Sequence, residues 1–176
     1  MEWEEDGEIE WGFDERIGRL VIKGKEPFIN YLYGDKTCRM KDYESCWGDI
    51  PPWMEKYKNK IQSVVVCYGV YSIGGNAFYG CENLKLAVLP ISITSIGNNA
   101  FNSCNGLISI QIPNSVAIIG ASAFNRCHNL RSVKIPSSVT DIGAYAFGYC
   151  PNLSDVSIPS HLTYSHFPRY AKIDRY

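Results

Sequence analysis

Cysteine and histidine are the residue types in this chain that could support nucleophilic or metal chemistry. There are seven cysteines and three histidines, and the histidines are His128, His161 and His166. His128 adjoins Cys127, but neighbours along the chain at that point should face in opposite directions, so no Cys–His pair is expected. The spacings CxxC and HExxH, which are typical of metal sites, are absent. We therefore expect neither enzymatic activity nor a metal or other cofactor.

The cysteines and serines of the second half of the chain recur at a fixed interval instead. Cysteine stands at every twenty-third position from Cys81 to Cys150, and Ser92, Ser115 and Ser138 keep the same step. A nucleophile needs one unique hydroxyl beside a base, so three equivalent serines favour a structural role. We expect a ladder of buried thiols and a ladder of serine–backbone hydrogen bonds. The other cysteines, Cys38, Cys46 and Cys67, have no spacing that dictates a disulfide.

These residues belong to a 23-residue unit that recurs four times without an insertion, with the pattern IGxxAFxxCxxLxxVxIPxSVTx. Each unit can bury its apolar side chains only against a neighbouring unit, so this period indicates one structural element stacked on copies of itself. The sequence therefore predicts a repeat solenoid whose interior holds Phe78, Phe101, Phe124 and Phe147 in a single column.

Each position of the unit has a structural interpretation. The LxxVxI segment, for example Leu107, Ile110 and Ile112, places three apolar side chains on one face of a short strand. The proline that follows lacks an N–H group and ends the pairing there. The glycine of Ile-Gly serves either a positive φ or a close backbone approach. Ala-Phe then begins a helical or 3₁₀ turn.

The period fades at both ends, which predicts three parts. Residues 1–60 are expected to form an N-terminal cap, with a β-hairpin within residues 9–33 and a short capping helix in PPWMEKYKNK. Trp53 and Tyr57 are four residues apart on that helix and should cover the first coil. Residues 61–163 form the solenoid, with four full units and partial flanking coils, and residues 164–176 a C-terminal cap or tail.

The charges are distributed unevenly along the chain. Residues 1–60 hold 14 acids and 10 bases, and six of the acids lie within the first ten residues, which indicates a solvated, frayed terminus. Residues 61–160 hold three acids and four bases, so there is no basic field for nucleic acid. No apolar stretch reaches the roughly 18 residues of a membrane span, and the start Met-Glu-Trp-Glu-Glu is unlike the basic start of a signal peptide.

Residues 61–162 resemble the BspA-like class of bacterial leucine-rich repeats, because Ile-Gly, Ala-Phe, Cys and Leu-x-x-Val-x-Ile-Pro agree with its consensus in register. The segment WGFDERIGRLVIKGKEPFINYL, followed by PPW, is similar to the module that often precedes such repeats. The resemblance implies a right-handed coil of short parallel β-strands with 3₁₀ or helical turns, capped at both ends. It also implies an extracellular or cell-surface location, with adhesion and binding to host proteins.

In such a solenoid the outward strand positions form the concave ligand face. Carried over by register, the candidate partner-binding residues are Gln62, Ser63, Val65, Lys85, Leu86, Val88, Ile108, Ser109, Gln111, Arg131, Ser132, Lys134, Ser154, Asp155 and Ser157. Exposed Leu86, Val88 and Ile108 are either tolerated aliphatics or a surface that a partner or another copy covers. We expect a non-enzymatic protein-binding or adhesion module of a bacterial surface or secreted protein, with a host matrix or cell-surface protein as its partner. The alternative is a structural or self-association module without a separate ligand.

Overall fold

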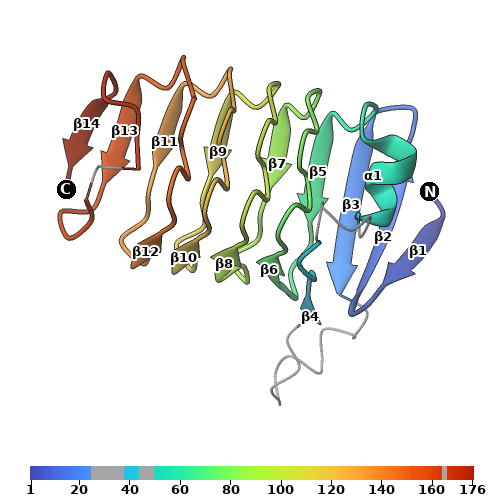
Figure 1. Cartoon of the computed structure of the whole chain (residues 1–176). Coiled ribbons are helices and arrows are strands. Elements are labelled where there is room, and N and C mark those ends of the chain that lie inside the picture. The colour runs from blue at the N-terminus through green and yellow to red at the C-terminus, as the bar shows by residue number, and fades with distance from the viewer. Residues whose placement is uncertain (25–37, 44–49, 164–165) are drawn as a thin grey trace, which may run out of the picture.

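The computed structural model describes residues 1–24, 38–43, 50–163 and 166–176, which are rich in short strands (Figure 1). Its helix, α1, spans Pro52–Tyr57. The strands are β1 Trp3–Asp6, β2 Ile9–Asp14, β3 Arg19–Gly24, β4 Cys38–Arg39, β5 Ser63–Val66, β6 Val70–Ile73, β7 Leu86–Val88, β8 Ser95–Ile96, β9 Ser109–Gln111, β10 Ile118–Ile119, β11 Ser132–Lys134, β12 Asp141–Ile142, β13 Asp155–Ile158 and β14 Lys172–Arg175.

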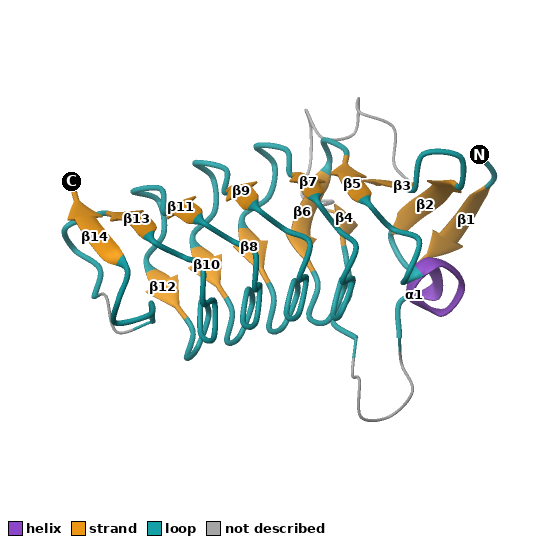
Figure 2. Ribbon diagram, turned by 90° about the horizontal axis from the view of Figure 1, so that it is seen from above, coloured by secondary structure: helices purple, strands orange, loops and turns teal. Residues whose placement is uncertain are grey.

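Each repeat unit contributes a strand to each of two rows. Strands β5, β7, β9, β11 and β13 follow one another along one side of the molecule, and β6, β8, β10 and β12 along another (Figures 1 and 2). The pairs within the repeats are parallel and keep the period, as in Ser109, Ser132 and Asp155, which are aligned across β9, β11 and β13. The expectation of short parallel strands is confirmed, whereas the right-handed coil stays a prediction.

A column of phenylalanine rings runs through the interior of the stack. The ring centroids of Phe78, Phe101, Phe124 and Phe147 are separated by 5.0, 5.3 and 5.2 Å, with interplanar angles of 23°, 2° and 11°. All four side chains are fully buried. The inward leucine, isoleucine and valine positions, such as Leu107, Ile110 and Ile112, are buried around this column. The interior predicted from the period is therefore confirmed.

The glycine of each Ile-Gly pair marks a close approach between neighbouring units. A Cβ atom on Gly97 would lie 2.5 Å from the backbone nitrogen of Gly75, and one on Gly143 would lie 2.3 Å from the nitrogen of Ala121. Contacts this short require a residue without a side chain. Of the two explanations offered by the sequence, close approach holds, because these glycines do not have positive φ.

Positive φ occurs instead at two other positions of the unit, and residues other than glycine occupy most of them. The first position is held by Asn76, Asn99, Ser122 and Tyr145, with φ of 57°, 55°, 55° and 56°. The second is held by Gly80, Ser103, Arg126 and Tyr149, with φ of 69°, 60°, 57° and 51°. Asparagine and glycine tolerate this region, whereas a bulky residue such as tyrosine is strained there.

Hydrogen bonds from serine side chains connect consecutive units. The hydroxyls of Ser92, Ser115 and Ser138 donate to the carbonyls of Val70, Ile93 and Val116, at 2.8, 2.7 and 2.7 Å. His161 takes the equivalent position in the last unit, where its Nε2 lies 2.9 Å from the carbonyl of Val139. The predicted serine ladder is confirmed, and histidine continues it.

The repeat cysteines form the predicted ladder of buried, free thiols. The Sγ atoms of Cys104, Cys127 and Cys150 donate to the carbonyls of Phe78, Phe101 and Phe124, at 3.2, 3.2 and 3.1 Å. Burial raises the pKa of Cys81 to about 12 and that of Cys150 to about 11, and it also raises the pKa of Cys104 and Cys127. The free thiol of Cys67 is half-buried, whereas the side chains of Cys38 and Cys46 lie outside the described residues.

The first residues of the chain are ordered, which corrects the expectation of a frayed acidic terminus. Strand β1 pairs antiparallel with β2, which pairs antiparallel with β3. Cations from distant positions pair with two of these acids: Lys56 Nζ lies 2.7 Å from Glu4 Oε1, and Lys41 Nζ lies 3.6 Å from Asp6 Oδ1. The hairpin comprises residues 9–24, and the remainder of the predicted hairpin, residues 25–33, lies outside the described part of the chain.

Aromatic side chains extend the phenylalanine column at both ends. Trp53 on α1 stacks on Phe78 at 6.1 Å and donates its Nε1–H to the carbonyl of Ala77 at 3.0 Å. Tyr57, four residues later, stacks instead on Phe13 of the hairpin, at 4.2 Å. At the other end Phe167 stacks on Phe147 at 4.9 Å, and β14 pairs in parallel with β13.

The raised pKa values of the thiols imply a loss of stability at alkaline pH. Above the usual thiol pKa of 9.0 the unfolded chain releases protons that the folded chain retains. The stability due to protonated thiols is thus complete below this pH and falls as the pH rises, by about 1.4 kcal/mol per pH unit for each buried thiol. Urea unfolding under reducing conditions between about pH 8 and about pH 10 measures this slope. We expect Cys104→Ala to flatten it, and an unchanged slope in that variant would contradict this account.

Relief of backbone strain at Tyr145 should stabilise the fold. Asn76 and Asn99 hold the same position in other units, and asparagine tolerates positive φ better than tyrosine does. We expect Tyr145→Asn to raise the free energy of unfolding by about 1 kcal/mol, measured by urea denaturation. The control is Tyr79→Asn, because Tyr79 is also exposed but does not have positive φ. Equal effects of the two substitutions would exclude backbone strain as the cause.

Candidate functional site

Ten of the candidate residues lie in two rows that cross the repeat strands. We call the outward side of β5, β7, β9, β11 and β13, with the residues that lead into these strands, the strand face. Ladder pairing aligns Ser63 with Leu86, and Val65 with Val88, across β5 and β7. It also aligns Gln111, Lys134 and Ser157 across β9, β11 and β13. The parallel pairing therefore aligns each row within two groups of strands, β5–β7 and β9–β11–β13, and the second group follows the first along the same side of the molecule.

A third row lies one residue before the strands, which corrects its assignment to outward strand positions. It consists of Gln62, Lys85, Ile108, Arg131 and Ser154. Backbone hydrogen bonds join its members, for example from Lys85 N to the carbonyl of Gln62 at 2.8 Å, and from Arg131 N to the carbonyl of Ile108 at 3.0 Å. These residues form the border of the strand face, because each of them lies between a turn and the first residue of a strand.

The apolar residues of the strand face gather at its N-terminal half. Leu86, Val88 and Ile108 have exposed fractions of 53%, 44% and 50%. Val65 is half-buried, and so is Val21, which pairs with it from the hairpin strand β3. The hairpin thus continues the face in register, and sequence analysis missed this contribution from Arg19 and Val21. The alternation in RLVIKG was the available signal, but it did not reveal which strand β3 would join.

The C-terminal half of the strand face is polar and positively charged. A shallow hollow of about 470 Å³ lies over β9 and β11, and its lining includes Ser109, Gln111, Ser132 and Lys134. Arg131, at the border of β11, is also exposed. Ser154 donates a hydrogen bond to Asp155 at 2.6 Å, so that part of this carboxylate is already engaged. Hydroxyl, amide and cationic groups on this half could hold carboxylates or backbone carbonyls of a partner.

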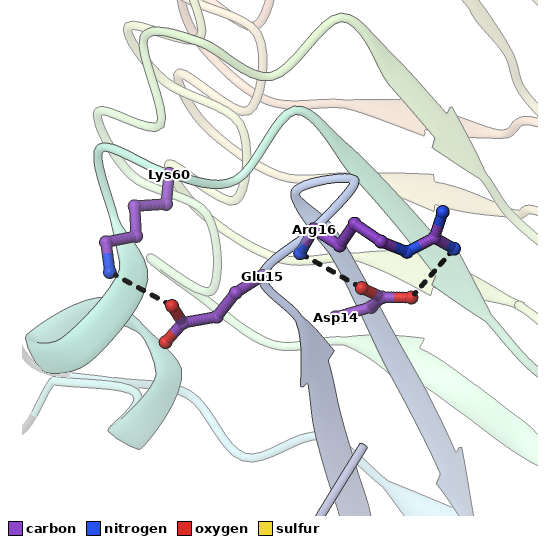
Figure 3. A network of polar contacts seen from close by, with 4 residues as sticks. All are labelled: Asp14, Glu15, Arg16 and Lys60. Atoms are coloured by element: carbon purple, nitrogen blue, oxygen red, sulfur yellow. Dashed lines mark hydrogen bonds and ion pairs between the residues drawn. The ribbon is translucent and has the colours of Figure 1, made fainter.

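The N-terminal border of the strand face meets the loop between β2 and β3. A hollow of about 400 Å³ there is lined by Glu15, Gly18, Asn59, Lys60, Gln62, Asn83 and Lys85. Lys60 Nζ lies 3.5 Å from Glu15 Oε2, and Asp14 holds Arg16 through both its backbone N–H and its guanidinium (Figure 3). Exposed ion pairs of this kind contribute little to stability. The position of the loop beside Gln62 and Lys85 is fixed by backbone hydrogen bonds as well, because the carbonyl of Gly18 accepts from the N–H groups of Gln62 and Ser63.

A third hollow, of about 680 Å³, lies over the other row of strands. Its polar groups already have structural roles: Thr94 Oγ1 donates to the carbonyl of Tyr71 at 3.1 Å, and Asp42 accepts the N–H of Gly75. Its exposed aliphatic side chain is Ile118, with an exposed fraction of 48%. This surface, on the other row of strands, provides a control for the strand face.

No group of three or more His, Cys, Asp or Glu side chains among the described residues could hold a metal ion. Within the same residues, no helix is long and apolar enough to cross a membrane.

The family model for the BspA type leucine rich repeat region matches residues 55–171, in six copies. The chain belongs to this family. The match exceeds the four complete units of the sequence pattern and reaches into the segments on both sides. Leucine-rich-repeat domains of this kind serve as protein-binding or structural repeat modules of bacterial proteins and are in general not enzymes.

Solved structures of bacterial leucine-rich-repeat proteins resemble the chain. A protein from Bacteroides ovatus is 33% identical with a TM-score of 0.64, over 67% of this chain and 31% of that one. The T. pallidum leucine rich repeat protein TpLRR is 22% identical with a TM-score of 0.64, over 94% of this chain and 78% of that one. A protein from Eubacterium ventriosum is 22% identical with a TM-score of 0.62, over 89% and 43%. The last two show the fold alone, and a search of curated proteins finds no match.

Proposed function

We propose that the chain is a non-enzymatic protein-binding module of a bacterial surface or secreted protein, and that it acts in adhesion through its strand face. The observation that carries the proposal is the exposure of Leu86, Val88 and Ile108 together on the strand face, on β7 and immediately before β9. Apolar side chains grouped on a surface are typical of places that a partner covers. Family membership supports the same role, because repeats of this kind present an extended surface to a ligand.

The chemistry of the strand face defines the partner it would fit. The apolar half, formed by β3, β5, β7 and Ile108 immediately before β9, would receive aliphatic or aromatic side chains. The neighbouring half carries Arg131 and Lys134 beside serines, and it would receive acidic groups and backbone carbonyls. We therefore propose a protein segment with apolar and acidic residues in succession, belonging to a host matrix or cell-surface protein.

The size of the strand face favours weak and multivalent contacts. Five repeat strands at about 4.8 Å each give a strip roughly 24 Å long, which is small beside the roughly 800 Å² per partner of a standard interface. Useful adhesion would then depend on several copies acting together. The chain spans 31% of the solved B. ovatus protein, so a whole protein of that kind has room for further modules.

The organisation and location of the protein are part of the proposal. We propose an N-terminal cap formed by residues 1–60, a solenoid formed by residues 61–163, and a C-terminal cap formed by residues 164–176. The aromatic contacts of Trp53 and Phe167 at the two ends of the phenylalanine column support this division. We also propose an extracellular or cell-surface location, which membership of the family supports.

Substitutions on the strand face should weaken binding to a host matrix protein. We expect Leu86→Glu with Ile108→Glu, and separately Arg131→Glu with Lys134→Glu, to reduce affinity at least about 10-fold. Surface plasmon resonance against a panel of purified matrix proteins measures this. Matched controls are Ile118→Glu, on the other row of strands, and Arg126→Glu, on the turns; both residues are exposed. Binding that survives both strand-face variants, or that the controls abolish equally, would exclude this site.

The same exposed aliphatics favour an alternative, namely a structural module that pairs with itself through the strand face and has no separate ligand. In that case Leu86→Glu or Ile108→Glu should convert a dimer to a monomer, as measured by light scattering, while Ile118→Glu should leave the dimer intact. A native chain that is monomeric at all concentrations would rule out this alternative.

A further inference from the structure

Strand β14 is the edge of the sheet at the C-terminal end of the molecule (Figures 1 and 2). On one side it pairs in parallel with β13. The N–H groups of Lys172 and Tyr176 donate to the carbonyls of Ser154 and Ile158, at 2.7 and 3.1 Å. Because alternate residues of a strand direct their backbone groups to opposite sides, Ile173 directs its N–H and carbonyl away from β13, and so does Arg175. The described residues offer these outward groups no partner.

An open edge of this kind is a template for another strand. We propose that a second copy of this chain docks on it, so that two β14 strands pair antiparallel about a two-fold axis at Ile173. The result is a closed dimer whose sheet continues from one copy into the other.

Backbone geometry and charge together select this register. Outward backbone groups must face each other, so Ile173 can lie opposite either Ile173 or Arg175 of the second copy. The second choice places two Asp174 carboxylates opposite each other, which is repulsive. The first places Lys172 opposite Asp174 of the second copy, twice by symmetry, and opposite charges in directly facing positions attract.

The side chains of Lys172 and Asp174 are available for these pairs. Both are exposed, and because they are two residues apart on a strand they share one face. In the chosen register they form non-hydrogen-bonded pairs, in which side chains of facing residues come closest. Ile173 between them is half-buried and packs against the core, so its position on the edge is fixed.

The open edge at the opposite end of the molecule, which belongs to a separate sheet, is a poorer partner for β14. Strand β1 is also an edge and carries acids, but Glu4 is held by Lys56 and Asp6 by Lys41. A contact between β14 of one copy and β1 of the next would not close and would produce open-ended polymers. When β14 of one copy pairs with β14 of the other, the two β14 edges are both covered and the assembly stops at a dimer. Because the strand has only four residues, the dimer is weak and depends on concentration.

Charge exchange on β14 tests the pairing. Asp174→Lys and Lys172→Asp each place like charges opposite one another, and each should raise the dissociation constant of the dimer about 10-fold or more in sedimentation equilibrium. The double variant with both substitutions should dimerise as the native chain does. An equimolar mixture of the two single variants should form heterodimers, because one strand then carries two acids and the other two lysines.

Controls separate this dimer from other self-association. Arg131→Glu changes an exposed cation on the strand face and should leave the dimer unchanged. Thermal unfolding of every variant should match the native chain at a dilution where all of them are monomeric. A native chain that stays monomeric at millimolar concentration, single variants that dimerise as well as the native chain, or open-ended polymers would each overturn the proposal. Loss of the dimer in Leu86→Glu, with no effect of the β14 variants, would overturn it in favour of the strand-face alternative.

Discussion

The close approach of successive backbones at the glycine of each Ile-Gly pair is the constraint on which the rest of the structure depends. A Cβ on Gly97 would stand 2.5 Å from the neighbouring backbone, so the spacing of the units leaves no room for any other residue. At this spacing the phenylalanine rings stack at 5.0–5.3 Å. The thiols and serines can then reach carbonyls of the preceding unit. A unit of different length would misplace all three contacts at once, which accounts for four copies without an insertion.

The interior could be predicted from the sequence because it repeats. A side chain such as Leu107 or Phe101 has the same surroundings in every unit, so the period alone determines which residues face inward. The ordered terminus could not be predicted in this way. From composition alone, Glu4 and Asp6 are expected to be solvated. The lysines that pair with them, Lys56 and Lys41, come from distant parts of the chain. The repeat positions with positive φ could not be predicted from the sequence either. Glycine is the usual signal for positive φ, and among these positions only Gly80 is a glycine.

The same reasoning explains which parts of the candidate site were predicted. Alignment of the units gave the rows of the strand face, whereas the residues that extend it, Arg19 and Val21 at one end and Lys172 and Asp174 at the other, lie outside the repeat pattern. These residues join the strand face because β3 pairs with β5 and β14 pairs with β13. The register of these two pairs depends on backbone geometry and not on the repeat. The division into an apolar and a cationic half follows from variable positions of the unit. The fold does not constrain the residue types at these positions, so they can differ between units to suit a partner.

The two ends of the phenylalanine column are closed to different degrees. Trp53 packs within a cluster that includes Trp11 and Tyr43, and its indole is tied to the backbone of Ala77. Phe167 packs at the opposite end beside the single strand β14, and the preceding residues depart from the repeat pattern. In a linear array each unit is stabilised by its immediate neighbours, so opening proceeds inward from whichever end is less secured. Amide protons should therefore exchange with solvent in a gradient, fastest in the last unit and slowest beside α1.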